Sequence, residues 1–251
     1  MIQFFRHIRQ RLLTENKFSK YLLYAVGEIV LVVIGILIAL QINNWNESRK
    51  IKHQEVSYLE RLLSENKLDI ETFAASIKDL EKGKETVVDF SEALKSNMIN
   101  NSLLIHYANE YFKYGSIYPI FSSSTSTFDD LSSTGNLEVI ANTRLRENIV
   151  KHYARHVQVS ERIEIAVGWA LPLDAPFTHE NDIMKFEPHT AFLFPASSRE
   201  ALANELRAKK VTYISNAAAH YWINMDAIEL LEDLKDQTNF LITELKKELD
   251  K

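Results

Sequence analysis

The chain has 251 residues, of which 46% are hydrophobic and 25% charged, and it contains 6 Gly, 5 Pro and no Cys. This composition excludes collagen-like and linker-like sequences, and the lack of Cys excludes a disulfide framework, a thiolate zinc site and an iron–sulfur cluster. The net charge of −5 is unevenly distributed, since residues 1–42 carry five Lys or Arg and two acids, whereas the remaining residues carry 24 Lys or Arg and 32 acids. This acidic remainder argues against nucleic-acid binding.

Residues 1–20 are predicted to form a short cytoplasmic head. Spaced as a helix, Phe5, Ile8 and Leu12 share one face, while Arg6 and Arg11 lie off that face. This pattern is typical of an amphipathic helix that lies in the membrane interface with its cations toward anionic lipid. A frayed basic tail is the alternative interpretation.

Residues 21–45 are predicted to form a transmembrane signal-anchor helix. Tyr21–Ile42 contains a single charge, Glu28. Tyr24 and Trp45 would lie about 31 Å apart along a helix, which matches the two aromatic belts of a bilayer. A buried core helix is seldom so long and so uniformly apolar, and no small-residue pattern for signal-peptide cleavage follows the run. We therefore expect this segment to cross the lipid bilayer once.

The charges that flank the span predict its orientation. Five Lys or Arg residues and the amino terminus precede it, and three follow it closely: Arg6, Arg9, Arg11, Lys17 and Lys20, then Arg49, Lys50 and Lys52. The excess favours a cytoplasmic N-terminus in the inner membrane. Residues 46–251 are then expected to form a periplasmic domain.

Three residues inside the span are candidates for helix association. Gly35 and Ala39 are small residues on one helix face, where they would let another helix approach closely. Glu28 is an ionisable side chain in an apolar run, which points to an interhelical hydrogen bond or ion pair. The alternatives remain open, because Gly is common in membrane helices and Glu28 lies only about one turn beyond Tyr24.

Two stretches resemble a known family. Glu15–Glu28 and Leu31–Glu47 read E-N-K-F-S-K-Y-L-L-Y-A-V-G-E and L-V-V-I-G-I-L-I-A-L-Q-I-N-N-W-N-E. Except for Val26 in place of Ile, this matches the head of an uncharacterised family of single-pass inner-membrane proteins that is abundant in Bacteroidota. A weaker match, F-x-x-L-x-S-x-G-x-L followed by a helix start, falls on Phe128, Leu131, Ser133, Gly135 and Leu137, then Leu145, Arg146, Ile149 and Tyr153. The resemblance implies a cytoplasmic head, one span and a helical periplasmic body, and it implies no activity.

The first half of the body is predicted to be helical. From Val56 to Leu94, apolar residues recur at steps of three and four, which indicates a long helix packed along a heptad seam, as in a coiled coil. The helix either continues to residue 94 or breaks near Gly83. A second helix is expected over 103–114, and a short one that Thr127 caps and Gly135 ends.

The second half is predicted to hold two more long helices. The first spans about 144–171, capped by Asn142 or Thr143, and carries a surface or partly buried pair, His152 and His156, rather than a metal site. The last runs from residue 198 or 199 to 249, with a break near Lys209. Together these elements predict an all-α fold, in which the N-terminal transmembrane helix continues into a periplasmic antiparallel helical bundle.

Residues 171–195 are predicted to form a long aromatic loop between those helices. This segment holds four of the five prolines, and long loops of this kind either cover a core or bind something. It therefore supplies the candidates for a partner or ligand surface: Phe177, His179, Phe186, Phe192 and Phe194.

No catalytic or cofactor motif is present, so we expect a non-enzymatic protein without catalytic, cofactor or metal residues. The leading hypothesis is a membrane-anchored helical module that binds a protein partner or itself in the cell envelope. The alternative is a ligand-sensing periplasmic bundle that signals through a partner protein. A third hypothesis, a hydrolase acting through residues 171–195, has no motif behind it.

Overall fold

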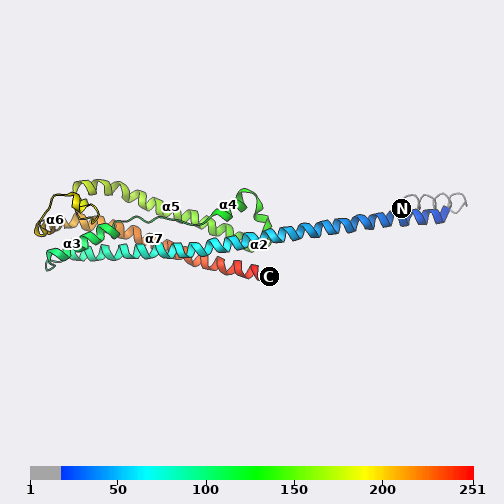
Figure 1. Cartoon of the computed structure of the whole chain (residues 1–251), viewed down its shortest axis with the longest axis horizontal. Coiled ribbons are helices and arrows are strands. Elements are labelled where there is room, and N and C mark those ends of the chain that lie inside the picture. Colours follow the sequence, from blue (N-terminus) through cyan, green and yellow to red (C-terminus); the bar gives the residue numbers. More distant parts are fainter. Residues whose placement is uncertain (1–17) are drawn as a thin grey trace. The chain divides into compact units, whose positions relative to one another are not determined.

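The computed structural model describes residues 18–251, and this part of the chain is helical without a strand. The expected amphipathic helix of the head falls on residues 1–17, outside the described residues. The chain divides into two compact units, an N-terminal unit up to residue 56 and a body of residues 57–251. Helix α2, Phe18–Lys95, begins in the first unit and ends in the second (Figure 1). The all-α part of the predicted fold is confirmed.

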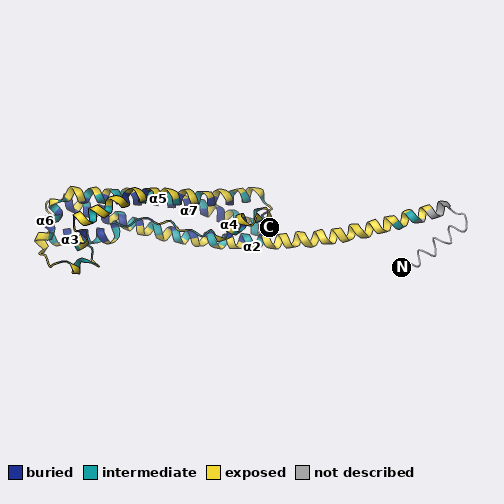
Figure 2. Cartoon of the chain, turned by 90° about the horizontal axis from the view of Figure 1, so that it is seen from above, coloured by how far each residue is buried: buried dark blue, intermediate teal, exposed yellow. Residues whose placement is uncertain are grey.

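The described part of the N-terminal unit, residues 18–56, is helical and is apolar as far as Ile42. Its large apolar side chains from Leu22 to Ile42 are all exposed (yellow in Figure 2). Among the described residues, this helix alone is long and apolar enough to cross a membrane. Exposing an apolar helix surface of that length to water is unfavourable. The segment therefore fits a membrane anchor.

The body is built around three long helices, α2, α5 and α7, which lie side by side (Figures 1 and 2). After α2, the long helices are α5 (Thr143–Glu180) and α7 (Lys210–Leu249). Shorter elements connect the long helices: α3 (Asn101–Glu110), the π-helical turn η1 (Tyr111–Gly115), α4 (Ser126–Ser133), η2 (Asn136–Val139), η3 (Ile183–Lys185), η4 (Ala191–Leu193) and α6 (Arg199–Ala208). The predicted division of the last helix at Lys209 is confirmed, because α6 ends and α7 begins there.

Helix α2 packs through the predicted seam. Every seventh residue along it is buried, namely Leu59, Asn66, Phe73, Leu80, Val87 and Leu94. Burial at a seven-residue period keeps one face of a helix against its neighbours, and each buried Leu or Phe contributes about 2 kcal/mol. The face meets α5 and α7, as in the cluster of Phe73, Ile163 and Leu231.

Helix α2 has no break at Gly83. An added Cβ at this residue would lie 2.9 Å from the Tyr114 carbonyl oxygen and 3.1 Å from Asn224 Nδ2. At this glycine, η1 and α7 therefore approach α2 closely. Close approach, rather than a chain break, explains a glycine inside this helix.

The helix caps follow the sequence except at Thr127. Asn142 accepts a hydrogen bond from the Leu145 amide at 3.2 Å, and Gly135 takes the left-handed conformation (φ 72°) after α4, both as predicted. The predicted cap at Thr127 is wrong, because α4 already begins at Ser126, after Thr125. A carboxylate from α2 takes the place of a local cap there.

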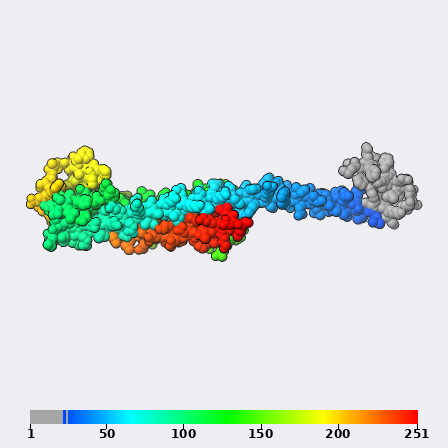
Figure 3. Space-filling model, turned by 60° about the horizontal axis from the view of Figure 1, so that its bottom comes forward, coloured from blue at the N-terminus to red at the C-terminus, as the bar shows by residue number. Residues whose placement is uncertain are grey.

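The predicted loop over residues 171–195 is wrong in its first part. Helix α5 continues to Glu180 with Pro172 and Pro176 inside it. A proline costs a helix one amide donor and a steric clash, about 3 kcal/mol, so tertiary contacts must offset it. Asp174, between the two prolines, makes such contacts with three side chains from other segments. The irregular segment is thus confined to residues 181–198, at one end of the body (yellow in Figure 3).

Candidate functional site

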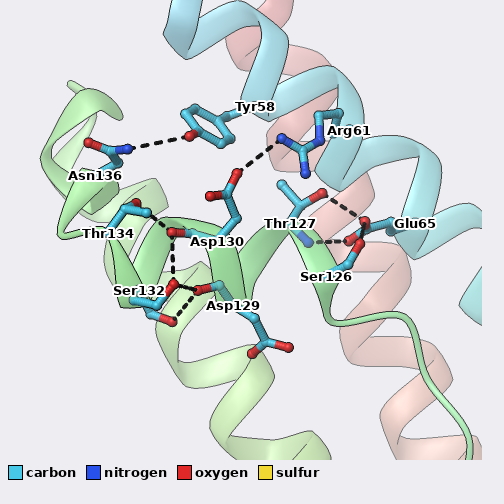
Figure 4. A network of polar contacts seen from close by, with 11 residues as sticks. Tyr58, Arg61, Glu65, Ser126, Thr127, Asp129, Asp130, Ser132, Thr134 and Asn136 are labelled. Carbon is cyan, nitrogen blue, oxygen red and sulfur yellow. Dashed lines mark hydrogen bonds and ion pairs between the residues drawn. The ribbon is translucent and has the colours of Figure 1, made fainter.

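The first polar cluster fastens α4 to α2 (Figure 4). One oxygen of the Glu65 carboxylate accepts hydrogen bonds from the hydroxyls of Ser126 at 2.5 Å and Thr127 at 2.7 Å, and the other accepts from the Thr127 amide at 3.2 Å. A negative charge is favourable at the first turn of a helix. Glu65 thus caps α4 from outside its own segment.

Further contacts complete this attachment. Arg61 pairs with Asp130 at 3.2 Å, and Ser124 donates its amide to Asp69 at 2.7 Å. Phe128 stacks on Tyr153 of α5, with ring centroids 4.4 Å apart. Residues 124–127 and the weaker family match therefore serve the packing of α4 on α2 and α5, and the hydroxyls of Thr125, Ser126 and Thr127 are hydrogen-bonded within the protein.

The second cluster is the histidine pair of α5. His152 and His156 lie with their Nε2 atoms 2.9 Å apart, and both side chains are buried, whereas a surface or partly buried pair was predicted. Phe73 and Phe121 contact His156 through ring edges. Burial lowers the pKa of His152 to about 3, with a further contribution from His156, and burial lowers the pKa of His156 to about 4. Within residues 18–251, no group of three or more potential ligands surrounds a metal position.

The third cluster centres on Asp174 of α5. One carboxylate oxygen, Oδ2, accepts a short hydrogen bond from the Tyr118 hydroxyl and lies 2.8 Å from His220 Nε2. The other oxygen, Oδ1, accepts from Asn216 Nδ2 at 2.7 Å. The hydroxyl of Tyr111, which is fully buried, donates a hydrogen bond to the side-chain oxygen Oδ1 of Asn216 at 2.7 Å. Three segments of the body thus meet at this carboxylate, and η1 joins them through Asn216.

These contacts fix the charge of the cluster. Burial by itself raises the pKa of the Asp174 carboxyl, but hydrogen bonds from His220, Tyr118 and Asn216 and the attraction of His220 outweigh it and hold the pKa below its usual range. Burial, and then the hydrogen bond to Asp174, raise the pKa of Tyr118 well above its usual range. Asp174 is therefore ionised at neutral pH, and Tyr118 is a neutral donor.

A pocket of about 360 Å³ opens beside this carboxylate. Its walls are mostly apolar, and its polar groups include Asp174, His220 and Asn216 together with Ser116, Thr178 and Glu187; the apolar lining comes from Phe112, Tyr118, Leu171, Ala175, Phe177, Ile183 and Met184. A few convergent polar groups in an apolar pocket of this size are typical of small-molecule sites.

The predicted surface candidates of the segment 171–195 do not form one site. Phe177 lines the pocket, but Phe186 is buried in the core against Phe112 and offers no surface, which corrects its assignment. Its burial follows from the aromatic core at this end of the body, where Tyr213 also meets it. His179 and Phe192 are exposed, and Phe194 is half-buried.

The span candidates lie on an exposed helix surface. Gly35 has no neighbour within 4 Å of an added Cβ, and Ala39 is exposed. Glu28 is half-buried. Nothing in the described residues covers the Gly35–Ala39 face.

The sequence did not point to Asp174, Tyr118, Asn216 or His220. Tyr118, Asn216 and His220 lie 42 to 56 residues from Asp174 in the sequence, and no short motif joins them to it. The one available signal was an acid between two prolines, because a helix that continues through prolines needs tertiary contacts to offset their cost.

An exposed apolar surface also lies on α5 and α7. Trp169 and Trp222 meet edge to face, with centroids 5.8 Å apart, yet remain 57% and 53% exposed. Ile165 and Leu173, each about one turn from Trp169, are also exposed, as is Val211 on α7. We call these five residues the Trp surface.

Comparison with known proteins adds one match. A family model described as "Family of unknown function (DUF6090)" matches residues 28–160. No curated protein and no solved structure matches the chain. The matched residues include most of the span and the α4 attachment, whereas the Asp174 cluster and the Trp surface lie beyond them, apart from Tyr111 and Tyr118.

Proposed function

Because this chain belongs to the family of unknown function DUF6090, whose model covers more than half of its length, we propose its role from its own geometry. It is a membrane-anchored, non-enzymatic module whose body is an antiparallel helical bundle that binds a second copy of the chain. The observation that carries this proposal is the Trp surface. Large exposed apolar patches on a protein mark interaction sites, and Trp is enriched at the energetic centre of interfaces.

The size of the Trp surface suits a second copy held in the same membrane. Two half-exposed Trp side chains and three exposed aliphatic ones offer roughly 500 Å² of apolar area, somewhat below the roughly 800 Å² per partner of a standard interface. Two copies anchored in one bilayer meet at a high effective concentration, which makes a smaller interface sufficient.

Symmetry supports the same partner. A two-fold interface uses the same patch on both copies, so one unpaired surface is covered completely by another copy. The span offers a second such surface at Gly35 and Ala39, and Glu28 lies on the same helix. An identical chain carries both surfaces.

We further propose that the N-terminus is cytoplasmic, that the anchor lies in the inner membrane, and that the body is periplasmic. The excess of Lys and Arg before the span supports this orientation. Reporter fusions at residues 1 and 251 test it, with an enzyme that is active only in the periplasm. Activity at the N-terminal fusion alone would contradict the orientation.

The mass of the full chain in mild detergent tests self-association. We expect a dimer for the wild type, and at least a 30-fold weaker association for the double variant Trp169→Ala/Trp222→Ala, since interface Trp residues are each worth about 2 kcal/mol or more. Phe240→Ala is the matched control, because Phe240 is an exposed aromatic residue of α7 outside the Trp surface. A wild-type chain that stays monomeric at all concentrations would refute the proposal.

A second candidate function is favoured by the pocket beside Asp174. A ligand-sensing bundle that signals through a partner protein needs a binding site in the body, and this pocket is a candidate for it. A ligand that binds the folded state raises its thermal stability, so thermal unfolding with added ligand tests this candidate separately from self-association.

A further inference from the structure

The pocket beside Asp174 carries a hydrogen-bond acceptor that the protein does not fill. A carboxylate offers about four acceptor positions. Tyr118 and His220 use two at Oδ2, and Asn216 uses one at Oδ1. One position on Oδ1 remains, on an ionised group that lines the pocket.

His220 contributes a second polar atom that the protein leaves without a partner. Its Nε2 atom faces the ionised carboxylate, so Nε2 carries the hydrogen and donates it. The other ring nitrogen is Nδ1. That atom is buried and has no hydrogen-bond partner in the described residues, the side chain is 1% exposed, and the residue lines the pocket. A buried polar atom without a partner is costly unless a ligand satisfies it.

The rest of the pocket sets the sign and shape of its ligand. Glu187 adds a second carboxyl group, and no Lys or Arg is among the described lining residues. Phe112, Tyr118 and Phe177 present aromatic rings, which attract cations through their faces and pack against apolar groups. An anionic ligand would lie beside two carboxyl groups, and a neutral ligand would bring no positive charge to the ionised Asp174 carboxylate.

From these features we infer that the pocket binds an organic ammonium ion. The ammonium group donates a hydrogen bond to Asp174 Oδ1, and an apolar body lies among the aromatic rings. The volume of about 360 Å³ suits a small metabolite. A bare divalent metal fits less well, because it requires several oxygen ligands and the pocket offers two carboxyl groups. This inference rests on the ligand-sensing candidate and names its ligand class.

Three probes with one skeleton and different charge test the inference. Phenethylamine, phenethyl alcohol and phenylacetate are titrated against the full chain in mild detergent, with the unfolding temperature and calorimetric binding as readouts. We expect phenethylamine to bind at least tenfold more tightly than either analogue. We expect Asp174→Asn to weaken it at least tenfold and Glu187→Gln to weaken it several-fold. Asp79→Asn, which removes one exposed acid of α2, should have no effect.

The outcomes separate the ligand class from the function. Equal or tighter binding of the alcohol or the acid overturns the ammonium assignment but keeps a ligand-binding pocket. Binding of none of the three overturns the assignment and counts against the ligand-sensing candidate itself. Full amine binding by folded Asp174→Asn also overturns the assignment. If that variant does not fold, undiminished amine selectivity in Glu187→Gln overturns it instead.

Discussion

Lowering the pH from 7.5 to 5 tests the buried histidine pair. His152 and His156 have pKa values of about 3 and about 4 in the folded chain, whereas the ordinary value of about 6.5 applies after unfolding. The unfolded chain therefore binds protons at pH 5 that the folded chain does not. The folded state loses stability as the pH falls below about 6.5, and the loss levels out near the folded pKa values.

The size of the loss follows from the pKa difference. At about 1.5 pH units below 6.5, each histidine costs about 2 kcal/mol, because one unit corresponds to about 1.4 kcal/mol. The pair together costs about 4 kcal/mol, a large part of the stability of an ordinary domain. Burial raises the pKa of Asp69, which works in the opposite sense, so the comparison is made between variants.

The assay is denaturant unfolding of the full chain in mild detergent, followed by the loss of helical ellipticity at several pH values. His152→Gln/His156→Gln is expected to remove most of the decline between pH 7.5 and 5. His179→Gln/His189→Gln, which replaces two exposed histidines, is the matched control and should keep the decline. A wild-type stability that does not change over this range, or an unchanged decline in the first double variant, would refute the reasoning.

Three further substitutions probe packing, each by the same unfolding assay at neutral pH. Glu65→Ala should lower the stability by about 2 kcal/mol, because buried Thr127 loses its acceptor, and a neutral result would mean that α4 is held by other contacts. Gly83→Ala should be destabilising by about 1 kcal/mol, because the new Cβ meets the Tyr114 carbonyl oxygen, and a gain in stability would show that this contact relaxes. Asn142→Ala should cost about 1 kcal/mol through the lost cap of α5, and no loss would rule out that role.

Much of the helical fold could be predicted from the sequence because local rules govern it. The seven-residue period identifies the buried face of α2, Asn142 identifies the start of α5, and Gly135 supplies the left-handed residue after α4. Each of these signals lies within the segment that it describes. The apolar anchor is predictable for the same reason.

The rest depends on contacts between distant segments. Thr127 matched the local pattern of a cap, but Glu65, 62 residues earlier, determines how α4 is held. Pro172 and Pro176 predict the end of a helix, yet Asp174 is held by side chains from segments on both sides of α5 in sequence. No periodicity in one segment reports such contacts, so the candidate site was not predictable from the sequence.

The prolines of α5 have a mechanical consequence. Pro172 and Pro176 lack amide hydrogens, so the carbonyls of Gly168 and Pro172 have no backbone donor four residues later. The turns that carry Asp174 therefore lack two backbone hydrogen bonds. They bend and open at a lower free energy than the N-terminal half of α5, which begins at Thr143. In hydrogen exchange, the amides of residues 173–180 should lose protection first. A ligand that ties Asp174 to α7 would slow their exchange, so the exchange rate of these amides would report whether the pocket is occupied.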